Sequence, residues 1–219
     1  MSQWQKEKEQ VLETARKMLA EGLVTGSAGN VSMRLTPFEG KEIIAITPHH
    51  IYYDQMTVDD IVVADFEGEP LEGDVPSAET MLHINIYQAR ERVKAVIHTH
   101  SVYASALAVA GKSLPPILDE QVAYLGSEVK LAKYAVSGSE ELAGNVVEAL
   151  GKNNAVLLPN HGMVGVGRSL REALTVCQLV ERTAQIYLLA QGLGGAVLLP
   201  PDVVEAEQSF FDMLQSGDE

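Results

Sequence analysis

Residues 95–100 read Ala-Val-Ile-His-Thr-His, an apolar run that ends in two histidines one residue apart. An apolar, β-branched run of this length predicts a β-strand. In a strand, side chains at i and i+2 point to the same face about 7 Å apart, so His98 and His100 can bind one metal ion through one ring nitrogen each. Alone, this pattern is more typical of two ordinary hydrogen-bonded histidines than of a metal site. Further ligands elsewhere in the chain are needed to favour a metal.

A third histidine follows another apolar, strand-like run. His161 lies in Pro159-Asn160-His161-Gly162, directly after the apolar residues 155–158. If the two strand ends meet, three imidazoles surround one ion and leave a coordination position open, as in catalytic sites and not in closed structural ones. We predict Zn²⁺, or another divalent transition metal, bound by His98, His100 and His161.

A carboxylate precedes these histidines at the start of a predicted helix that runs from Ser77 to about Arg90. Glu79 lies in its first turn, where the helix dipole favours a negative charge, and this electrostatic role is the simplest interpretation of Glu79 alone. Beside a metal-bound carbonyl substrate, the same carboxylate can carry a proton to and from carbon. His83, one turn later on the same helical face, is expected to have a supporting role at most.

Residues 24–30, Val-Thr-Gly-Ser-Ala-Gly-Asn, are small and polar. Their glycines permit backbone shapes that larger residues disfavour, so this loop is a candidate cradle for an anion, with Gly29 and Asn30 at its end.

Hydrophobic periodicity predicts helices and strands in irregular alternation along the whole chain. We read them as one α/β domain, residues 1–219, with residues 196–219 as a C-terminal tail. The predicted helices cover residues 3–21, 102–110, 139–150, 169–191 and 203–214, and further strands cover residues 31–34, 43–46, 61–64, 120–124, 155–158 and 163–166.

Composition narrows the function classes. The 219 residues are 46% hydrophobic and 21% charged, which is typical of a globular protein with a core, and the formal net charge of −14 argues against nucleic acid and membrane partners. The N-terminus lacks the pattern of a secretory signal, and the most apolar runs are strand-sized. The only cysteine, Cys177, suits a reducing compartment, so we expect a cytoplasmic protein.

Five segments of the chain, in this order, resemble those of the class II aldolase/adducin family. They are Gly26-Ser-Ala-Gly-Asn-Val-Ser32, Ile46-Thr-Pro48, Pro76-Ser-Ala-Glu79, His98-Thr-His100 and Asn160-His-Gly162. The resemblance covers roughly residues 5–195. It implies that His98, His100 and His161 are zinc ligands, that Glu79 is the catalytic acid/base, and that Asn30 and Ser77 bind phosphate.

The resemblance also implies a fold and a reaction. The expected fold is a three-layer α/β/α arrangement with a mainly antiparallel central sheet, and the expected assembly is a homo-oligomer, usually a tetramer. The expected function is a zinc-dependent lyase that cleaves a ketose phosphate by retro-aldol chemistry through a metal-stabilised enediolate. A dehydratase, a decarboxylase or a 4-epimerase acting on a related sugar phosphate or sugar acid would use the same intermediate.

Two departures from the family pattern affect the substrate site. In the family that this chain resembles, aldolases have Thr-Pro-x-Gly where this chain has Thr47-Pro-His-His50. His49 and His50 can therefore add a cationic donor for phosphate or block the approach of the backbone to it. They can also be solvated residues of a surface turn. The family's paired serines are here Ser77 and Ala78.

The family's catalytic tyrosine, which a neighbouring subunit contributes, is also missing near residues 118–121. Asp119 or Glu120 could then act as the second acid if it were desolvated, or Tyr124 could reach over. A noncatalytic adducin-like interaction module is the alternative from another class, and the presence of all the expected ligands argues against it.

Overall fold

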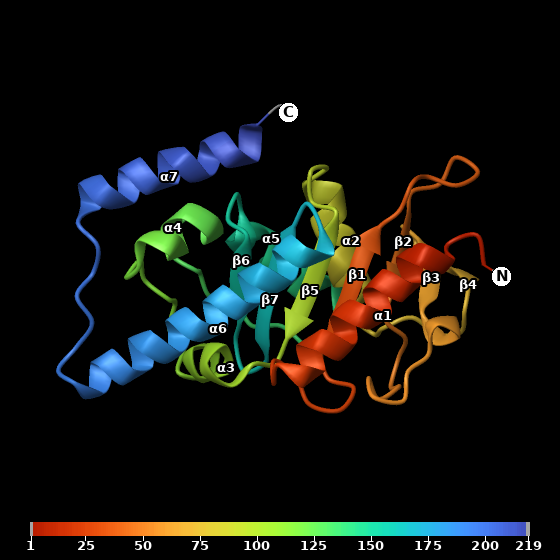
Figure 1. Ribbon diagram of the computed structural model, residues 1–219, viewed down its shortest axis with the longest axis horizontal. Helices are drawn as coiled ribbons and strands as arrows, with labels where there is room; N and C mark the ends of the chain where they lie inside the picture. The colour runs from red at the N-terminus through yellow and green to blue at the C-terminus, as the bar shows by residue number, and fades with distance from the viewer. Residues whose placement is uncertain (1, 218–219) are drawn as a thin grey trace.

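A seven-stranded sheet forms the centre of the protein (Figure 1), in a computed structural model that describes residues 2–217. Every pair of neighbouring strands is antiparallel, in the order β4-β3-β2-β1-β5-β7-β6. Residues 1, 218 and 219 of the predicted domain and tail lie outside the described residues. The strands are β1 Asn30–Arg34, β2 Ile43–Ile46, β3 Val62–Asp65, β4 Pro70–Glu72, β5 Ala95–Thr99, β6 Ala155–Leu158 and β7 Gly162–Gly167.

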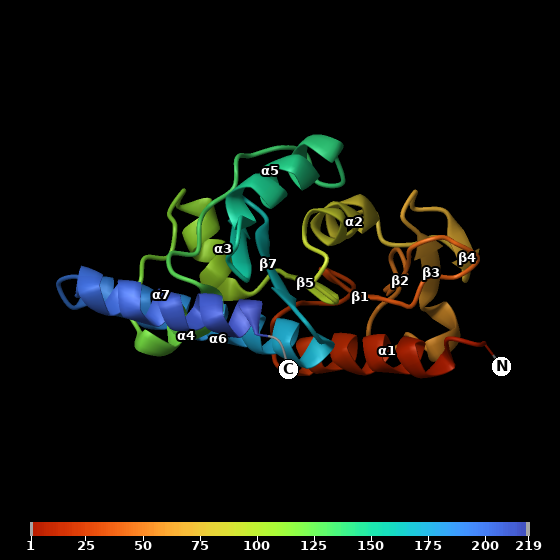
Figure 2. The same cartoon turned by 90° about the horizontal axis from the view of Figure 1, so that it is seen from above.

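Helices cover both faces of the sheet, which confirms the three-layer α/β/α prediction (Figure 2). One layer contains α1, α3, α4 and α6, and the other contains α2 and α5. The helices are α1 Gln5–Ala20, η1 Val58–Asp60, α2 Thr80–Ala89, α3 Val102–Val109, α4 Asp119–Leu125, α5 Glu140–Leu150, α6 Leu170–Gly192 and α7 Pro201–Ser216.

Strand β5 divides its side chains between the two layers. Ala95 and Ile97 are buried with α1 and α6, whereas Val96 is buried with α2 and α5. Since side chains alternate along a strand, His98 continues the face of Val96. This periodicity directs His98 toward the layer that contains α2.

The strand predicted at residues 120–124 is wrong, because these residues form the helix α4. Buried Val122 and Leu125 are three residues apart and share one helical face, and Gly126 ends the helix in the left-handed region at φ +104°. Buried Gln121 also joins α4 to the segment before it, since its side-chain amide donates to the carbonyl of Pro115 at 2.9 Å.

The C-terminal tail finds a partner within the chain. Helix α7 packs on α4 (Figure 1), and Phe211 is buried there with 1% of its surface exposed. Phe210 and Met213 on the same helix remain exposed, at 44% and 58%. The apolar pattern of the tail is therefore only partly explained by packing within one subunit.

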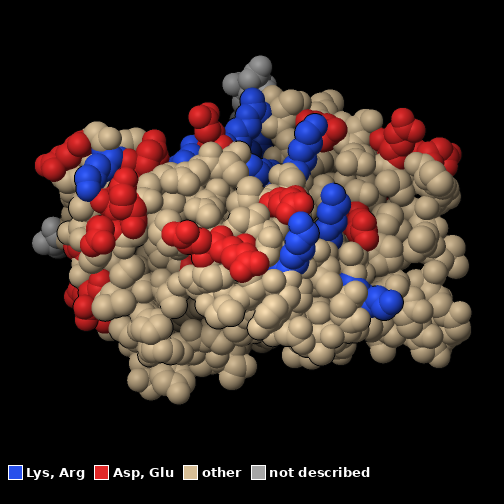
Figure 3. Space-filling view, turned by 180° about the vertical axis from the view of Figure 1, so that it is seen from behind, with Lys and Arg blue, Asp and Glu red and all other residues tan. Residues whose placement is uncertain are grey.

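Charged side chains are unevenly distributed on the face that α2 and α5 cover. Seen from behind (Figure 3), acidic side chains gather toward the edge where β3 and β4 lie, whereas the lower part of this face shows few charges. No helix among residues 2–217 has both the length and the apolar character needed to cross a membrane.

Candidate active site

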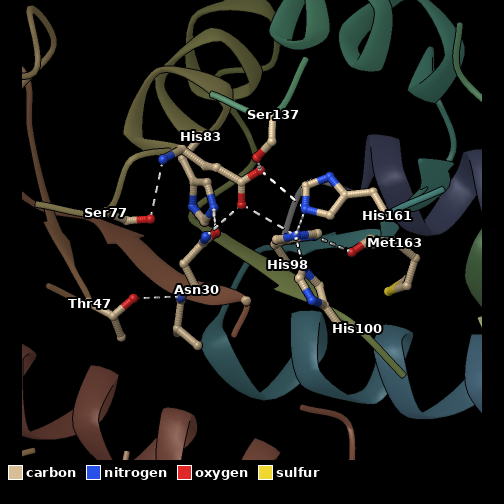
Figure 4. Close-up of polar contacts among 12 residues, drawn as sticks. Asn30, Thr47, Ser77, His83, His98, His100, Ser137, His161 and Met163 are labelled. Carbon is tan, nitrogen blue, oxygen red and sulfur yellow. Dashed lines mark hydrogen bonds and ion pairs between the residues drawn. The ribbon is translucent and has the colours of Figure 1, made fainter. Parts of the chain in front are cut away.

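Three histidines converge at the end of strand β5. The imidazoles of His98, His100 and His161 point toward one another (Figure 4), and each offers a ligand atom within 4.8 Å of the others. His161 reaches this place because the β6–β7 turn runs against β5. A Cβ on Gly162 would lie 2.1 Å from the Thr99 carbonyl oxygen, so only glycine permits this approach.

The protonation of His98 makes the cluster a set of metal-binding donors. Its Nδ1 lies 2.9 Å from the Met163 carbonyl oxygen, which can only accept, so Nδ1 carries the proton and Nε2 presents a lone pair. That Nε2 faces the Nε2 atoms of His100 at 2.9 Å and of His161 at 3.1 Å. Nitrogen atoms this close need a shared proton or a cation between them, and three such donors can hold one metal ion.

The other two imidazoles are held in their neutral, metal-binding form. Burial, together with repulsion from His98 and His161, lowers the pKa of His100 to about 3 against the opposing effect of Glu79. Burial and the same repulsion from His98 lower the pKa of His161 to about 4, against the opposing effect of Glu79. The cluster is therefore compatible with a metal site.

Glu79 lies beside these histidines, immediately before the first residue of α2, and is buried. Its Oε2 is 3.3 Å from His98 Nε2, and its Oε1 is 3.5 Å from His161 Nε2. Asn30 Nδ2 donates to Oε2 and Ser137 Oγ donates to Oε1, each at 2.9 Å. Burial alone would raise the pKa of Glu79, but the two histidines and the two donors outweigh it and lower the pKa to about 2. Glu79 is thus an ionised proton acceptor.

The predicted anion loop lies against the same strand end. Gly29 has φ +72°, and a Cβ there would lie 2.4 Å from the His98 carbonyl oxygen, so the close approach requires glycine. Asn30 pairs with His98 in the β1–β5 register. The structure therefore brings Gly29 and Asn30 beside the histidines.

Two further loops are joined next to this one. The Ser77 backbone N–H donates to the Thr47 carbonyl at 3.2 Å, and the His49 N–H donates to the Val75 carbonyl at 3.0 Å. Ser77 Oγ accepts from the Glu79 N–H at 3.3 Å. His49 and His50 are exposed, and their rings lie 3.7 Å apart. His50 has φ +58°, a left-handed conformation that favours glycine.

The candidate second acids lie elsewhere. Asp119 and Glu120 are exposed residues of the first turn of α4, and Glu120 Oε1 accepts from Arg182 Nη1 on α6 at 2.5 Å. Tyr124, on the same helix, is 57% exposed. In Figure 1, α4 lies beside α7 and away from the end of β5 that carries the histidines. Within the described chain, none of the three contacts Glu79.

Sequence reasoning missed one hydroxyl side chain that contacts Glu79 and two that are buried further along α2 and β1. Ser137, in the loop before α5, donates directly to Glu79, and nothing in its sequence context signals this contact. Ser32 and Tyr87 form a buried hydrogen bond with one another at 2.7 Å. Their spacing is informative in retrospect, since Ser32 lies two residues after Asn30 on a strand and Tyr87 lies eight residues after Glu79 on a helix.

Several known proteins similar to this chain are named as sugar-phosphate aldolases. The family described as the Class II Aldolase and Adducin N-terminal domain matches residues 9–188. A 5-deoxy-D-ribulose 1-phosphate aldolase of Bacillus thuringiensis is 35% identical over 92% of this chain and 93% of its own length. A 5-methylthioribulose-1-phosphate/5-deoxyribulose-1-phosphate aldolase of Escherichia coli is 36% identical over 92% and 91%. A solved L-fuculose 1-phosphate aldolase superposes with a TM-score of 0.88 at 34% identity, covering 97% of this chain and 98% of that one.

Proposed function

The chain belongs to the class II aldolase and adducin family, and on this basis we propose that it is a zinc-dependent aldehyde-lyase. The proposed reaction cleaves a ketose 1-phosphate between C3 and C4, giving an aldehyde and a three-carbon hydroxyketone phosphate. The observation that carries the proposal is the contact of one buried, ionised carboxylate, Glu79, with two members of the histidine cluster.

Glu79 is proposed to move the proton at C3. Its position beside the histidines places a proton acceptor next to any carbonyl compound bound there, and its lowered pKa keeps it in the ionised form. In the direction of carbon–carbon bond formation, the carboxylate takes a proton from the hydroxyketone phosphate. In cleavage, the C4 hydroxyl loses its proton to a second group as the C3–C4 bond breaks, and a proton taken up from solvent is delivered through Glu79 to C3. A divalent ion held by His98, His100 and His161 would supply positive charge that stabilises the oxyanion developing at the substrate carbonyl.

The phosphate group is proposed to bind where the three loops meet. Backbone N–H groups of residues 26–30 supply donors, except that of Ala28, which donates to the Thr25 carbonyl. The hydroxyl of Ser77 is a further donor, and His49 or His50 supplies a cationic donor when protonated. Asn30 already donates one N–H to Glu79, so a single N–H of its amide remains for the substrate. Support for this arrangement comes from the backbone pairing of the loops.

The second proton transfer, at the C4 hydroxyl, is assigned to Asp119 or Glu120 of a neighbouring subunit. Both carboxylates are exposed, and burial against another subunit would desolvate them as acid–base chemistry requires. A homo-oligomer, with a tetramer as the specific proposal, is supported by exposed apolar residues near α4. Leu193 and Val197 are 89% and 90% exposed, and Leu199 ties this segment to Pro116 just before α4.

The names of the relatives suggest the first substrates to test. The proteins above are named for 5-deoxyribulose, 5-methylthioribulose and fuculose 1-phosphates. We extend this class, small ketose 1-phosphates with a short tail beyond C4, to the present chain. A cytoplasmic location is part of the same proposal, since such metabolites are intracellular and the lone cysteine is a buried free thiol.

A product analysis tests the proposal. The protein is stripped of metal, reloaded with Zn²⁺, and incubated with 5-deoxyribulose 1-phosphate or L-fuculose 1-phosphate. We expect an aldehyde and the hydroxyketone phosphate in equal amounts, and only with the ion present. Release of water or carbon dioxide, or an epimer as the only product, would replace the lyase with the corresponding alternative. Failure to bind a stoichiometric divalent ion would favour a noncatalytic module.

A further inference from the structure

A continuous chain of buried hydrogen bonds connects Glu79 to the interior of the protein through α2 and β1. Glu79, His83 and Tyr87 are spaced four residues apart and form one stripe along α2. Asn30 and Ser32 are two residues apart on β1 and share the strand face opposite this stripe. We infer that Asn30 and His83 are positioning residues, which hold the Glu79 carboxylate through this chain.

Residues of α2 and β1 alternate along this chain of hydrogen bonds. Tyr87 Oη lies 2.7 Å from Ser32 Oγ, and Ser32 Oγ lies 2.6 Å from His83 Nδ1. His83 Nε2 lies 2.5 Å from Asn30 Oδ1, and Asn30 Nδ2 lies 2.9 Å from Glu79 Oε2. His83, Ser32 and Tyr87 are completely buried, so water cannot replace a missing link.

Each link fixes the direction of the next. An ionised Glu79 can only accept, so Asn30 must turn its N–H₂ toward the carboxylate and its oxygen toward His83. That oxygen requires a proton on His83 Nε2, which leaves Nδ1 of the neutral ring to accept from the Ser32 hydroxyl. With its one proton used, Ser32 accepts from the hydroxyl of Tyr87. The direction of donation runs from Tyr87 to Glu79 without a conflict.

Two ionisation preferences agree with this direction. Burial lowers the pKa of His83 to about 3, with repulsion from His98 adding to the effect and Glu79 opposing it. Burial also raises the pKa of Tyr87, against the effects of its hydrogen bond with Ser32 and of the charge of Arg34. A neutral imidazole and a protonated phenol are the two states that the chain requires.

The chain gives Asn30 a role distinct from phosphate binding. If Asn30 mainly bound phosphate, changes along the chain would raise KM for a phosphorylated substrate. If Asn30 and His83 position Glu79, the same changes lower the rate of proton transfer and leave KM nearly unchanged. This inference rests on the proposed function, in which Glu79 moves the proton at carbon.

The kinetic test compares two His83 variants of similar size. Gln can keep a donor near the position of Nε2, whereas Leu cannot, so His83→Gln is the conservative partner of His83→Leu. The measured step is deuterium uptake from D₂O into the hydroxyketone phosphate by zinc-loaded protein. We expect His83→Leu to slow uptake about tenfold with KM within about threefold, the size of one lost hydrogen bond, and His83→Gln to recover most of the rate. Equal metal content in both variants and Asp65→Asn, a distant control with normal uptake, complete the comparison.

Ser32→Ala keeps the test decisive if His83→Leu does not fold. This smaller change should slow uptake about threefold at constant KM, because the His83 tautomer loses its donor. Uptake within experimental error of the wild type in Ser32→Ala and in any folded His83 variant would overturn the inference. So would a loss confined to KM, or a loss in His83→Leu that Gln does not restore.

A second measurement needs neither metal nor substrate. Long-range proton–nitrogen NMR of the metal-free protein reports the tautomer of His83, and we expect the proton on Nε2. A proton on Nδ1 would overturn the inference, since Asn30 Oδ1 would then face a lone pair. Absence of deuterium uptake in the wild type would count against the proposed function, and the NMR result would still decide the hydrogen-bond chain.

Discussion

The carboxylate beside α2 and β1 and the carboxylates of helix α4 have opposite surroundings. Glu79 is buried, receives hydrogen bonds from Asn30 and Ser137, and lies within 3.5 Å of two histidines. Glu120 on α4 is exposed, and its described partner is the surface residue Arg182. One subunit therefore surrounds Glu79, the proposed base, with partners, whereas the candidate second acids lie exposed at the surface. The two proposed proton transfers, at C3 and at the C4 hydroxyl, can be measured independently, the first by deuterium uptake and the second by cleavage.

Removing a metal ligand should have the largest effect. His161→Ala deletes one of three nitrogen donors, so we expect loss of the bound divalent ion together with all measurable cleavage. Elemental analysis of the purified variant and a cleavage assay at the same protein concentration check this. Full activity without a bound ion would contradict the assignment of His161 as a metal ligand, since His161 would then be an ordinary turn residue.

Removing the charge of Glu79 should be nearly as severe and should differ in kind. Glu79→Gln keeps the size of the side chain and the three histidines, so the ion should stay bound while turnover falls at least about a hundredfold. Metal content and kcat are measured on the same sample. A variant with normal metal and more than about a hundredth of wild-type turnover would exclude Glu79 as the base.

The carboxylates of α4 should affect one half-reaction and spare the other. We expect Asp119→Asn to lower cleavage about tenfold or more, because it removes the group that takes the proton from the C4 hydroxyl, while deuterium uptake into the hydroxyketone phosphate stays within about twofold. Glu120→Gln should have a smaller effect, because Glu120 is engaged by Arg182. If neither variant changes cleavage, the second acid lies outside α4. If both variants lose uptake, the two regions are not independent.

His50→Gly restores the residue that the family pattern has in this loop. A left-handed conformation costs a side-chain-bearing residue about 1 kcal/mol, so the free energy of unfolding should rise by up to that amount. KM for the phosphorylated substrate should rise about threefold, because the phosphate loses a cationic donor. Denaturant unfolding and steady-state kinetics measure the two effects. An unchanged KM would remove His50 from phosphate recognition and leave His49.

Substitution of Asp65, a buried carboxylate at the opposite end of the sheet, should have the smallest effect on activity. Burial alone would raise the pKa of Asp65, but the Lys41 ammonium at 2.6 Å and the backbone N–H groups of Glu67 and Glu69 lower it below its usual range. Its stabilising contribution is therefore present above the unfolded-state pKa near 3.9 and is lost as the pH falls through the lower folded-state value.

Asp65→Asn should accordingly destabilise the protein by about 2 kcal/mol at pH 7 and leave deuterium uptake unchanged. The difference in stability from wild type should narrow as the pH falls below about 4. Urea titrations at several pH values measure it. A difference that is constant with pH would mean that the carboxylate charge is not what stabilises this turn.

Local patterns predicted most of the fold and the convergence of the three histidines. The apolar runs that end in His98 and His161 gave the correct strands, and the i, i+2 spacing gave the shared face of His98 and His100. The three-layer arrangement followed from family resemblance and not from periodicity. Segment 120–124 was misread because its seven-residue helix is too short to show a helical period, and buried Gln121 interrupts its apolar pattern.

What the sequence did not provide was contact between distant polar residues. Ser137 meets Glu79 across 58 positions, and its neighbours in the sequence give no sign of this contact. Asp119 and Glu120 were placed near the chemistry by analogy with the family, and a single chain does not bring them there. Their role stays a prediction, as do the phosphate contacts of Ser77, His49 and His50.

Deuterium uptake by the wild-type protein tests the central claim most directly. The hydroxyketone phosphate is incubated in D₂O with protein that carries one divalent ion per chain, and with the same protein after metal removal. We predict a single deuterium at the carbon that would become C3, at one of its two prochiral positions because Glu79 reaches one face, and only with the ion bound. No uptake by the fully loaded protein, or equal uptake after metal removal, would contradict the account.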